Sequence, residues 1–143
     1  MIKNERQLKI TKKKLREFDV LVSDLKAESN GTKDLRLKMQ IDALNSDISL
    51  MRQEVNDFEE LKSGKVRTII AKTFHELPEI IIKARIARSM THKDLAMALK
   101  VNEQQIQRYE NNNYASVSFS KLEKIVEILD IAMEETATLV QKK

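Results

Sequence analysis

Apolar residues in the first half of the chain recur every three or four positions, which is the period of an amphipathic α-helix. Within residues 4–28 one position of this repeat is polar, and its members are Leu8, Thr11, Leu15, Phe18, Val22 and Leu25. Within residues 33–62 the repeat is unbroken, and its members are Leu37, Ile41, Leu44, Ile48, Met51, Val55 and Phe58. Because spacings of three and four alternate, each set forms a heptad seam, which predicts two long helices of the coiled-coil type.

Short polar segments mark the ends of these helices. Asn4 with Gln7 is a suitable cap for the first helix and Thr32 for the second, and Asn30-Gly31 between them is a strong turn signal. Two long helices joined by a short loop predict an antiparallel hairpin. Such a hairpin has little core of its own, so we expect a homodimer. The alternatives are that the hairpin folds back on the C-terminal part of the chain, or that it binds a different protein.

The hairpin ends at Ser63-Gly64, which gives a first domain over residues 1–64. Residues 65–77 are rich in β-branched side chains and form the linker, as a short strand, an extended segment or a continued helix. The remaining residues, 78–143, are expected to form a second helical domain. The whole chain is therefore predicted to be all-α.

The pattern changes between residues 91 and 112, where two short helices joined by a tight turn are predicted. Thr91 with Asp94 resembles a capping box at the first helix, and Asn102 with Gln105 is suitable for the second. The positions expected to face inward are Leu95, Ala96, Leu99, Val101, Ile106 and Tyr109. This is the pattern of a helix-turn-helix, for which double-stranded DNA is the expected ligand.

Further helices are predicted on both sides of this pair. The helix that begins near Pro78 carries Ile82 and Ile86 on its core face, and its exposed residues are expected to be Lys83, Arg85 and Arg88. After the pair, Ser118 or Ser120 is expected to cap a helix that closes the core. The tail from residue 131 to 143 has apolar residues at helical spacing, so it is interpreted as a final helix or a dimer contact.

Candidate DNA-binding side chains lie on the outward face of the second short helix. Its polar residues are Glu103, Gln104, Gln107 and Arg108. Gln pairs well with adenine and Arg with guanine, so these side chains are candidates for reading bases. Lys100 at the turn, with Tyr114 and Ser116 in the loop that follows, are candidates for phosphate contacts. The alternative is that these are the ordinary solvated residues of an amphipathic helix and its loop.

Residues 78–130 resemble the phage-repressor-like helix-turn-helix class, the Cro and lambda-repressor type that is also called the XRE family. The resemblance is carried by PEIIIKARIARSMTHKDLAMAL, KVNEQQIQRYENN and SFSKLEKIVEILDI. It implies a compact bundle of about five helices that binds DNA, usually as a dimer. It implies base contacts by Glu103, Gln104 and Arg108, and phosphate contacts near His92, Lys93 and Asn111. The chain departs from the family at Lys100, where glycine is common; a non-glycine residue with positive φ there costs about 1 kcal/mol.

Composition excludes several other classes of protein. The chain has no Cys, two isolated Gly, two His and a formal charge of +4. These features leave no disulfide framework, zinc motif or phosphate-binding glycine loop, so we expect no metal, no cofactor and no enzymatic activity. The sequence has no apolar run of the roughly 18 residues that a membrane helix needs. We therefore expect a cytoplasmic protein of the bacterial or phage type, associated with the nucleoid and without membrane contact.

These observations predict a sequence-specific transcriptional regulator that binds a palindromic operator as a homodimer, with residues 103–111 in the major groove. One alternative is an antitoxin-type protein that binds a toxin or other partner through its hairpin and regulates its own promoter. Another is a nucleoid binder with little sequence preference. The modest positive charge argues against that last alternative, because non-specific binding depends mainly on charge.

Overall fold

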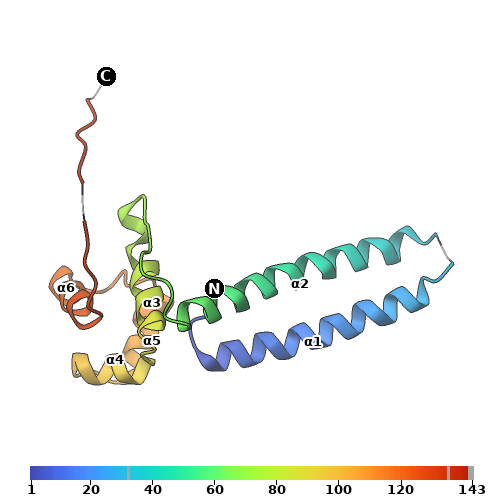
Figure 1. The fold of residues 1–143 in the computed structure, drawn as a ribbon, viewed down its shortest axis with the longest axis horizontal. Helices are drawn as coiled ribbons and strands as arrows, with labels where there is room; N and C mark the ends of the chain where they lie inside the picture. The colour runs from blue at the N-terminus through green and yellow to red at the C-terminus, as the bar shows by residue number, and fades with distance from the viewer. Residues whose placement is uncertain (32, 135, 142–143) are drawn as a thin grey trace. The chain divides into compact units, whose positions relative to one another are not determined.

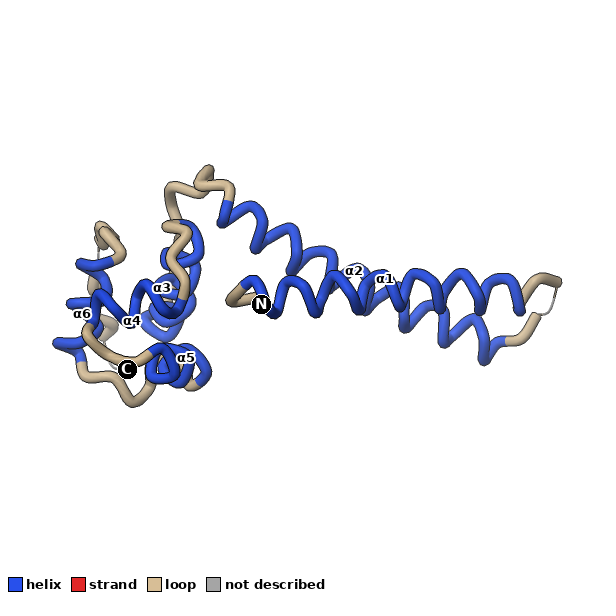
Figure 2. Tube along the Cα trace, turned by 90° about the horizontal axis from the view of Figure 1, so that it is seen from below, coloured by secondary structure: helices blue, strands red, loops and turns tan. Residues whose placement is uncertain are grey.

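The computed structural model describes residues 1–31, 33–134 and 136–141. Over these residues the chain is helical, with six α-helices, one 3-10 turn and no strand (Figure 1, Figure 2). The predicted all-α class is therefore confirmed. Close contacts along the chain define two compact units, one of Met1–Ile69 with Ile86–Ser89 and one of Ile70–Arg85 with Met90–Lys143.

The first unit contains the predicted hairpin. Helix α1 (Glu5–Glu28) and helix α2 (Leu35–Lys62) lie side by side and antiparallel (Figure 1, Figure 2). The turn between them includes Gly31, whose φ of 87° lies in the left-handed region that glycine favours. The seam positions are buried or half-buried, and those nearly fully buried are Leu8, Val22, Ile48, Val55 and Phe58. The two heptad patterns therefore meet inside one chain.

Local hydrogen bonds explain where the two helices begin. The Asn4 side chain accepts a hydrogen bond from the Gln7 backbone N–H at 2.9 Å, as predicted. The predicted cap Thr32 lies outside the described residues. The Asp34 side chain accepts a bond from the Arg36 backbone N–H at 2.8 Å and caps α2. Both caps satisfy backbone donors that a helix start leaves unpaired.

Ion pairs between α1 and α2 join positions that only an antiparallel register brings together. Arg52 contacts Asp19 at 2.9 Å near the middle of the hairpin. Toward the open end, Lys12 pairs with Glu59 and Glu5 with Lys62. The residue numbers of the α2 partners therefore rise as those of the α1 partners fall, as expected for antiparallel helices. These side chains are exposed, and each such pair contributes at most about 1 kcal/mol. Their main effect is therefore on register.

The second half of the chain contains the shorter helices. Their bounds are η1 (Phe74–Glu76), α3 (Leu77–Ala87), α4 (His92–Leu99), α5 (Glu103–Asn111) and α6 (Phe119–Ile128). Helix α4 contacts both α5 and α6. The side chains at most 1% exposed are Ile81, Ile82, Leu95, Ile106, Glu110, Ile125 and Leu129. All but one are apolar, as expected for the core of a small helical bundle.

Two segments left open by the sequence have no regular structure. Residues 65–71 are neither helix nor strand, so neither a short strand nor a continued helix is formed there. Residues 131–134 and 136–141 are also outside any helix, so a final helix is not formed there. Helix α6 is capped by Ser118, which accepts a hydrogen bond from the Lys121 backbone N–H at 3.4 Å.

Candidate nucleic-acid interface

Helix α4 begins at the predicted capping box. The Thr91 hydroxyl accepts a hydrogen bond from the Asp94 backbone N–H at 3.1 Å, and the Asp94 carboxylate accepts one from the Thr91 backbone N–H at 2.7 Å. The Thr91 hydroxyl also donates to that carboxylate at 2.7 Å, and these bonds from Thr91 hold the pKa of Asp94 below its ordinary value. The start of the first helix of the motif is therefore defined by local hydrogen bonds.

The turn between α4 and α5 uses a left-handed residue, as the family resemblance implied. Lys100 has φ 58° and ψ 42°, and the Val101 backbone N–H donates to the Ala96 carbonyl at 3.0 Å. This is the hydrogen bond that closes a helix with a left-handed C-terminal residue. Asn102 then caps α5 by accepting a bond from the Gln105 backbone N–H at 2.8 Å. The turn therefore forms without glycine, at a cost of about 1 kcal/mol.

Helix α5 has two distinct faces. Ile106, Tyr109 and Glu110 are buried, and these positions attach the helix to the core. All four predicted base-reading side chains are exposed, namely Glu103, Gln104, Gln107 and Arg108. The structure therefore brings these four together on one accessible face of a single helix.

The four exposed side chains of α5 differ in whether they form hydrogen bonds with the rest of the chain. The Gln107 amide donates to the Glu103 carboxylate at 3.1 Å, one helical turn away. Gln104 and Arg108 are also one turn apart, and neither side chain has a hydrogen bond or ion pair with the described residues. Their amide and guanidinium groups are thus available to an external ligand. An amide and a guanidinium are the groups that bind the edges of adenine and guanine.

A buried ionic cluster lies behind α5. The Arg85 guanidinium donates to the Glu110 carboxylate at 2.6 and 2.9 Å, and to the Met90 carbonyl at 2.9 Å. His92 Nε2 lies 2.8 Å from Glu110 Oε2 and 3.1 Å from Arg85 Nη2. Since Arg85 and Glu110 are 2% and 1% exposed, the expectation that Arg85 faces solvent is wrong. Its side chain is drawn inward because Glu110 offers both carboxylate oxygens to one guanidinium.

The cluster joins α3, the α3–α4 connection and α4 to α5. Arg85 comes from α3, Met90 from the α3–α4 connection, His92 from the start of α4 and Glu110 from the end of α5. Burial by itself raises the pKa of Glu110, but the hydrogen bonds from His92 and Arg85 outweigh burial and hold that pKa below its ordinary value. Glu110 was missed in the sequence, although its spacing of four from Ile106 places it on the inward face.

The predicted phosphate-contacting residues fall into two groups. Lys93, Lys100, Asn111 and Ser116 are exposed, and the Ser116 hydroxyl is hydrogen bonded to the Asn112 amide at 3.0 Å. His92 is 7% exposed and its ring is engaged with Glu110, so it is not presented to a phosphate. The structure therefore corrects that expectation.

Tyr114 is the second residue whose placement differs from its predicted role. It is 3% exposed, and its ring centroid lies 6.1 Å from that of Tyr109. Its hydroxyl has no hydrogen-bond partner within the described part of the chain, and burial raises its pKa. Tyr114 has φ 57° and Asn113 before it has φ 52°, so both lie in the left-handed region. The side chain packs in the core instead of facing a phosphate.

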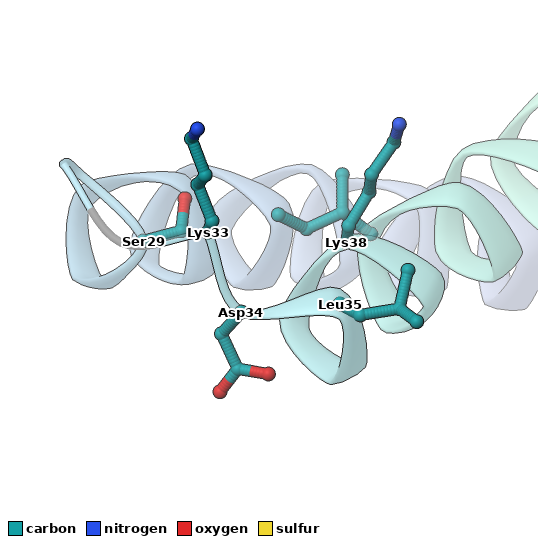
Figure 3. A pocket seen from close by; sticks show the side chains of 6 residues that line it. Ser29, Lys33, Asp34, Leu35 and Lys38 are labelled. Atoms are coloured by element: carbon teal, nitrogen blue, oxygen red, sulfur yellow. The ribbon is translucent and has the colours of Figure 1, made fainter.

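A shallow pocket lies at the closed end of the hairpin, beside the turn (Figure 3). Its lining residues are Ser29, Lys33, Asp34, Leu35, Lys38 and Ile41. The lysine side chains extend to one side of the hairpin, and the Asp34 carboxylate extends to the other (Figure 3). The lining therefore lacks the convergent polar groups of a small-molecule site.

Comparison with known proteins assigns the second half of the chain. Residues 81–135, which include α4, α5 and α6, match the family model described as Helix-turn-helix. No curated protein and no solved structure matches the chain. None of the described helices is long and apolar enough to cross a membrane. The chain therefore carries, over residues 81–135, a DNA-binding helix-turn-helix domain of the XRE family of transcriptional regulators.

Proposed function

We propose that the protein is a sequence-specific regulator of transcription in which the outward face of α5 lies in the major groove of an operator. The observation that carries this proposal is the pair Gln104 and Arg108, which are exposed, adjacent and without partners among the described residues. The opposite face of α5 is held by Ile106, Tyr109 and Glu110. A reading helix needs this combination of free polar groups and a rigid attachment.

The exposed residues have distinct proposed roles. Arg108 binds guanine and Gln104 binds adenine, each through two parallel hydrogen bonds. Glu103, supported by the Gln107 amide, accepts a hydrogen bond from cytosine and disfavours bases that present only acceptors. Phosphate contacts come from Lys93, Lys100, Asn111 and Ser116, which fix the position of the helix on the duplex. We propose that this site binds DNA and carries out no catalytic reaction.

The proposed operator is palindromic, because the proposed active form is a homodimer. Two identical domains related by a two-fold axis meet two identical half-sites on opposite strands. If the domains are held rigidly, the half-sites are separated by about one turn of the double helix or a multiple of it. The operator's symmetry therefore reports the oligomeric state of the bound protein.

The test is an in vitro selection of binding sites from random duplex DNA, followed by affinity measurements on α5 variants. Arg108→Ala and Gln104→Ala should each weaken binding to the selected operator by about 1–3 kcal/mol, which is roughly 5- to 150-fold, and relax the base preference at one position. Binding to unrelated duplex should change far less, because it depends on phosphate contacts.

Arg16→Ala is the matched control for Arg108→Ala. Arg16 is exposed on α1, so its replacement removes the same charge outside the helix-turn-helix. It should leave both affinity and base preference unchanged. Folded Arg108→Ala and Gln104→Ala proteins that bind the selected operator as tightly as the parent would refute the proposed placement of α5.

A partner-binding function of the antitoxin type is the second candidate. One observation favours it, namely that α2 exposes Leu35, Met39 and Leu50 on its outer face, at 69%, 64% and 67% exposure. Exposed apolar side chains that gather on one face are typical of protein-binding surfaces. If site selection with folded protein enriches no motif, a partner-binding hairpin becomes the preferred function.

A further inference from the structure

The outer face of α2 carries apolar side chains that no described residue of the hairpin covers. Helix α1 packs on the opposite face, where Ile48, Val55 and Phe58 are buried. On the outer face, Met39 and Leu50 are each about two-thirds exposed. Because the heptad seam is already filled within one chain, self-association requires a different surface. Leu35, Met39 and Leu50 are the large apolar side chains that α2 leaves exposed.

The spacing of residues on this face is symmetric. Met39, Ala43, Ser46 and Leu50 follow at intervals of four, three and four, so the pattern is the same in both directions along the helix. If two α2 helices pair antiparallel about a two-fold axis midway between Ala43 and Ser46, Met39 of each copy lies opposite Leu50 of the other. Ala43 then lies opposite Ser46. A two-fold interface needs this kind of self-complementary surface.

The centre of the pattern is suited to close packing. Ala43 and Ser46 are small, and the distance between packed helix axes decreases with the size of the side chains at the contact. The Ser46 hydroxyl donates a hydrogen bond to the Asp42 carbonyl at 3.0 Å. Its donor is therefore already satisfied, so burial of Ser46 leaves no unpaired hydroxyl proton.

The charges along α2 favour the antiparallel arrangement over the parallel one. The beginning of the helix is basic, with Lys33, Arg36 and Lys38 against one acid, Asp34. Lys33 and Lys38 extend to the same side of the hairpin (Figure 3). Residues 53–60 contain four carboxylates and no basic residue. Glu54 pairs with the N-terminal amine and Glu59 with Lys12 of the same chain, so Asp57 and Glu60 are the acids left to meet the basic end of a second copy. Antiparallel pairing sets the basic end of each copy against the acidic end of the other, whereas parallel pairing sets like charges together.

We propose that the outer face of α2, defined by Met39, Ala43, Ser46 and Leu50, is the interface at which two copies of the chain pair antiparallel. The result is a four-helix assembly with each α1 on the outside of its own α2. This interface deepens the proposed function, because it supplies the two-fold symmetry that a palindromic operator requires. It rests on the hairpin alone and is testable without DNA.

Engineered cysteines test the register directly, because the chain has no natural Cys. Met39→Cys and Leu50→Cys are made singly and together and then oxidised. In the proposed pairing the two copies of residue 39 lie about 16 Å apart along the helix axis, at 1.5 Å per residue. A disulfide needs Cα atoms within about 7 Å. The double variant should therefore become a covalent dimer on a non-reducing gel, and each single variant should remain unlinked.

Other arrangements of the two chains predict different cross-linked species on the gel. A parallel pair of α2 helices would cross-link Met39→Cys alone, which would overturn the proposal. A double variant that links no better than the single variants would overturn it as well. An equal mixture of the two single variants provides a second confirmation, because position 39 of one copy meets position 50 of the other and the mixture should form the covalent dimer.

Sedimentation of the full chain with Leu50→Glu tests whether this face carries the dimer. Leu50→Glu should make the protein monomeric at concentrations where the parent is dimeric, with unchanged helical circular dichroism. Val20→Glu is the matched control, since Val20 is 60% exposed on α1 and its replacement should leave the dimer intact. A monomeric parent chain, or a Leu50→Glu protein that remains dimeric, overturns the proposal.

Affinity for DNA separates this inference from the proposed function. Leu50→Glu should retain the base preference of a half-site but bind the palindrome roughly 100-fold more weakly, because two linked sites gain avidity. If the unmodified chain is a dimer but shows no base preference, the proposed function is contradicted and the α2 interface is not. A palindromic motif selected by a chain that sediments as a monomer with and without DNA would overturn the interface alone.

Discussion

At the scale of single residues, the hydrogen bonds that begin the helices are local, whereas those that hold α5 against the core join distant parts of the chain. The caps Asn4, Thr91 and Asn102 each bond a backbone N–H three residues away, so the sequence alone identifies them. Arg85 and Glu110 are 25 residues apart, and their pairing depends on how α3 and α5 come together. An arginine on a helix is ordinarily solvent-exposed. A buried carboxylate partner is what reverses that expectation here.

The first prediction concerns this Arg85–Glu110 pair. Glu110→Ala should lower the free energy of unfolding of the second unit by about 3–5 kcal/mol, because it leaves the Arg85 charge buried without its carboxylate. Arg85→Met with Glu110→Leu should lose less than Glu110→Ala, since no charge then stays buried. Urea unfolding followed by tyrosine fluorescence measures this, because Tyr109 and Tyr114 are the two Tyr of the chain and it has no Trp.

Acid provides a second readout of the same pair. The pKa of Glu110 lies below its ordinary 4.5 in the folded state, so its contribution is complete above about pH 4.5 and is lost as the pH falls through the lowered pKa. The parent chain should therefore lose stability more steeply below pH 4.5 than the Arg85→Met, Glu110→Leu variant. Equal acid slopes, or a Glu110→Ala protein as stable as the parent, would contradict a stabilising role for this cluster.

At the scale of elements, periodicity predicted the helices well because each long helix repeats its pattern many times. The α1 and α2 seams were identified, and the positions in them are buried or half-buried. Periodicity was a poor guide for short segments, because their secondary structure depends on contacts with residues far away in the sequence. Residues 65–71 are rich in β-branched side chains but form no strand, since the described residues offer no neighbouring strand with which to pair. Residues 131–134 and 136–141 have apolar residues at helical spacing but form no helix, and a helix this short is marginal without packing partners.

The second prediction concerns the α1–α2 seam. Ile48 is 5% exposed, so Ile48→Asp places a charge between the helices and should melt the hairpin itself. Because α1 and α2 hold 24 and 28 residues against 11, 8, 9 and 10 in α3 to α6, the circular dichroism signal at 222 nm should fall by about half. The tyrosine transition of the second unit should persist.

Ser49→Asp is the matched control, because Ser49 is exposed on the same helix. It should leave the helical signal and the thermal transition of the hairpin unchanged. With Ile48 buried in the seam of its own hairpin, a simple change from folded dimer to folded monomer in Ile48→Asp would be contrary to the structure.

At the scale of the whole molecule, the charge is modest, at +4 over 143 residues, so a general attraction to nucleic acid is weak. Binding must therefore depend on a few cations placed near the duplex. Lys93 and Lys100 are exposed at the start of α4 and at the turn before α5. The sequence gives the total charge directly. It does not reveal that His92 and Tyr114 are buried, and their burial removes two of the expected phosphate contacts.

The third prediction uses salt to count these contacts. Lys93→Ala and Lys100→Ala should each reduce the slope of log affinity against log salt concentration by about 0.9, the value for one phosphate contact on double-stranded DNA. Lys9→Ala removes the same charge from an exposed site on α1 and should leave the slope unchanged. Fluorescence anisotropy across a salt series measures all three. A slope that changes equally in all three variants would indicate that total charge, and not position, controls binding.

The two-faced character of α5 has a consequence for how such a protein acquires new targets. Attachment depends on Ile106, Tyr109 and Glu110, whereas the side chains of Gln104 and Arg108 make no hydrogen bond or ion pair with the described residues. In the proposed mode of binding, substitutions at these outward positions change the base preference with little penalty in folding. The residues proposed to read bases and the residues that hold α5 in the core are thus separate sets, so the proposed base preference can change while the scaffold stays the same.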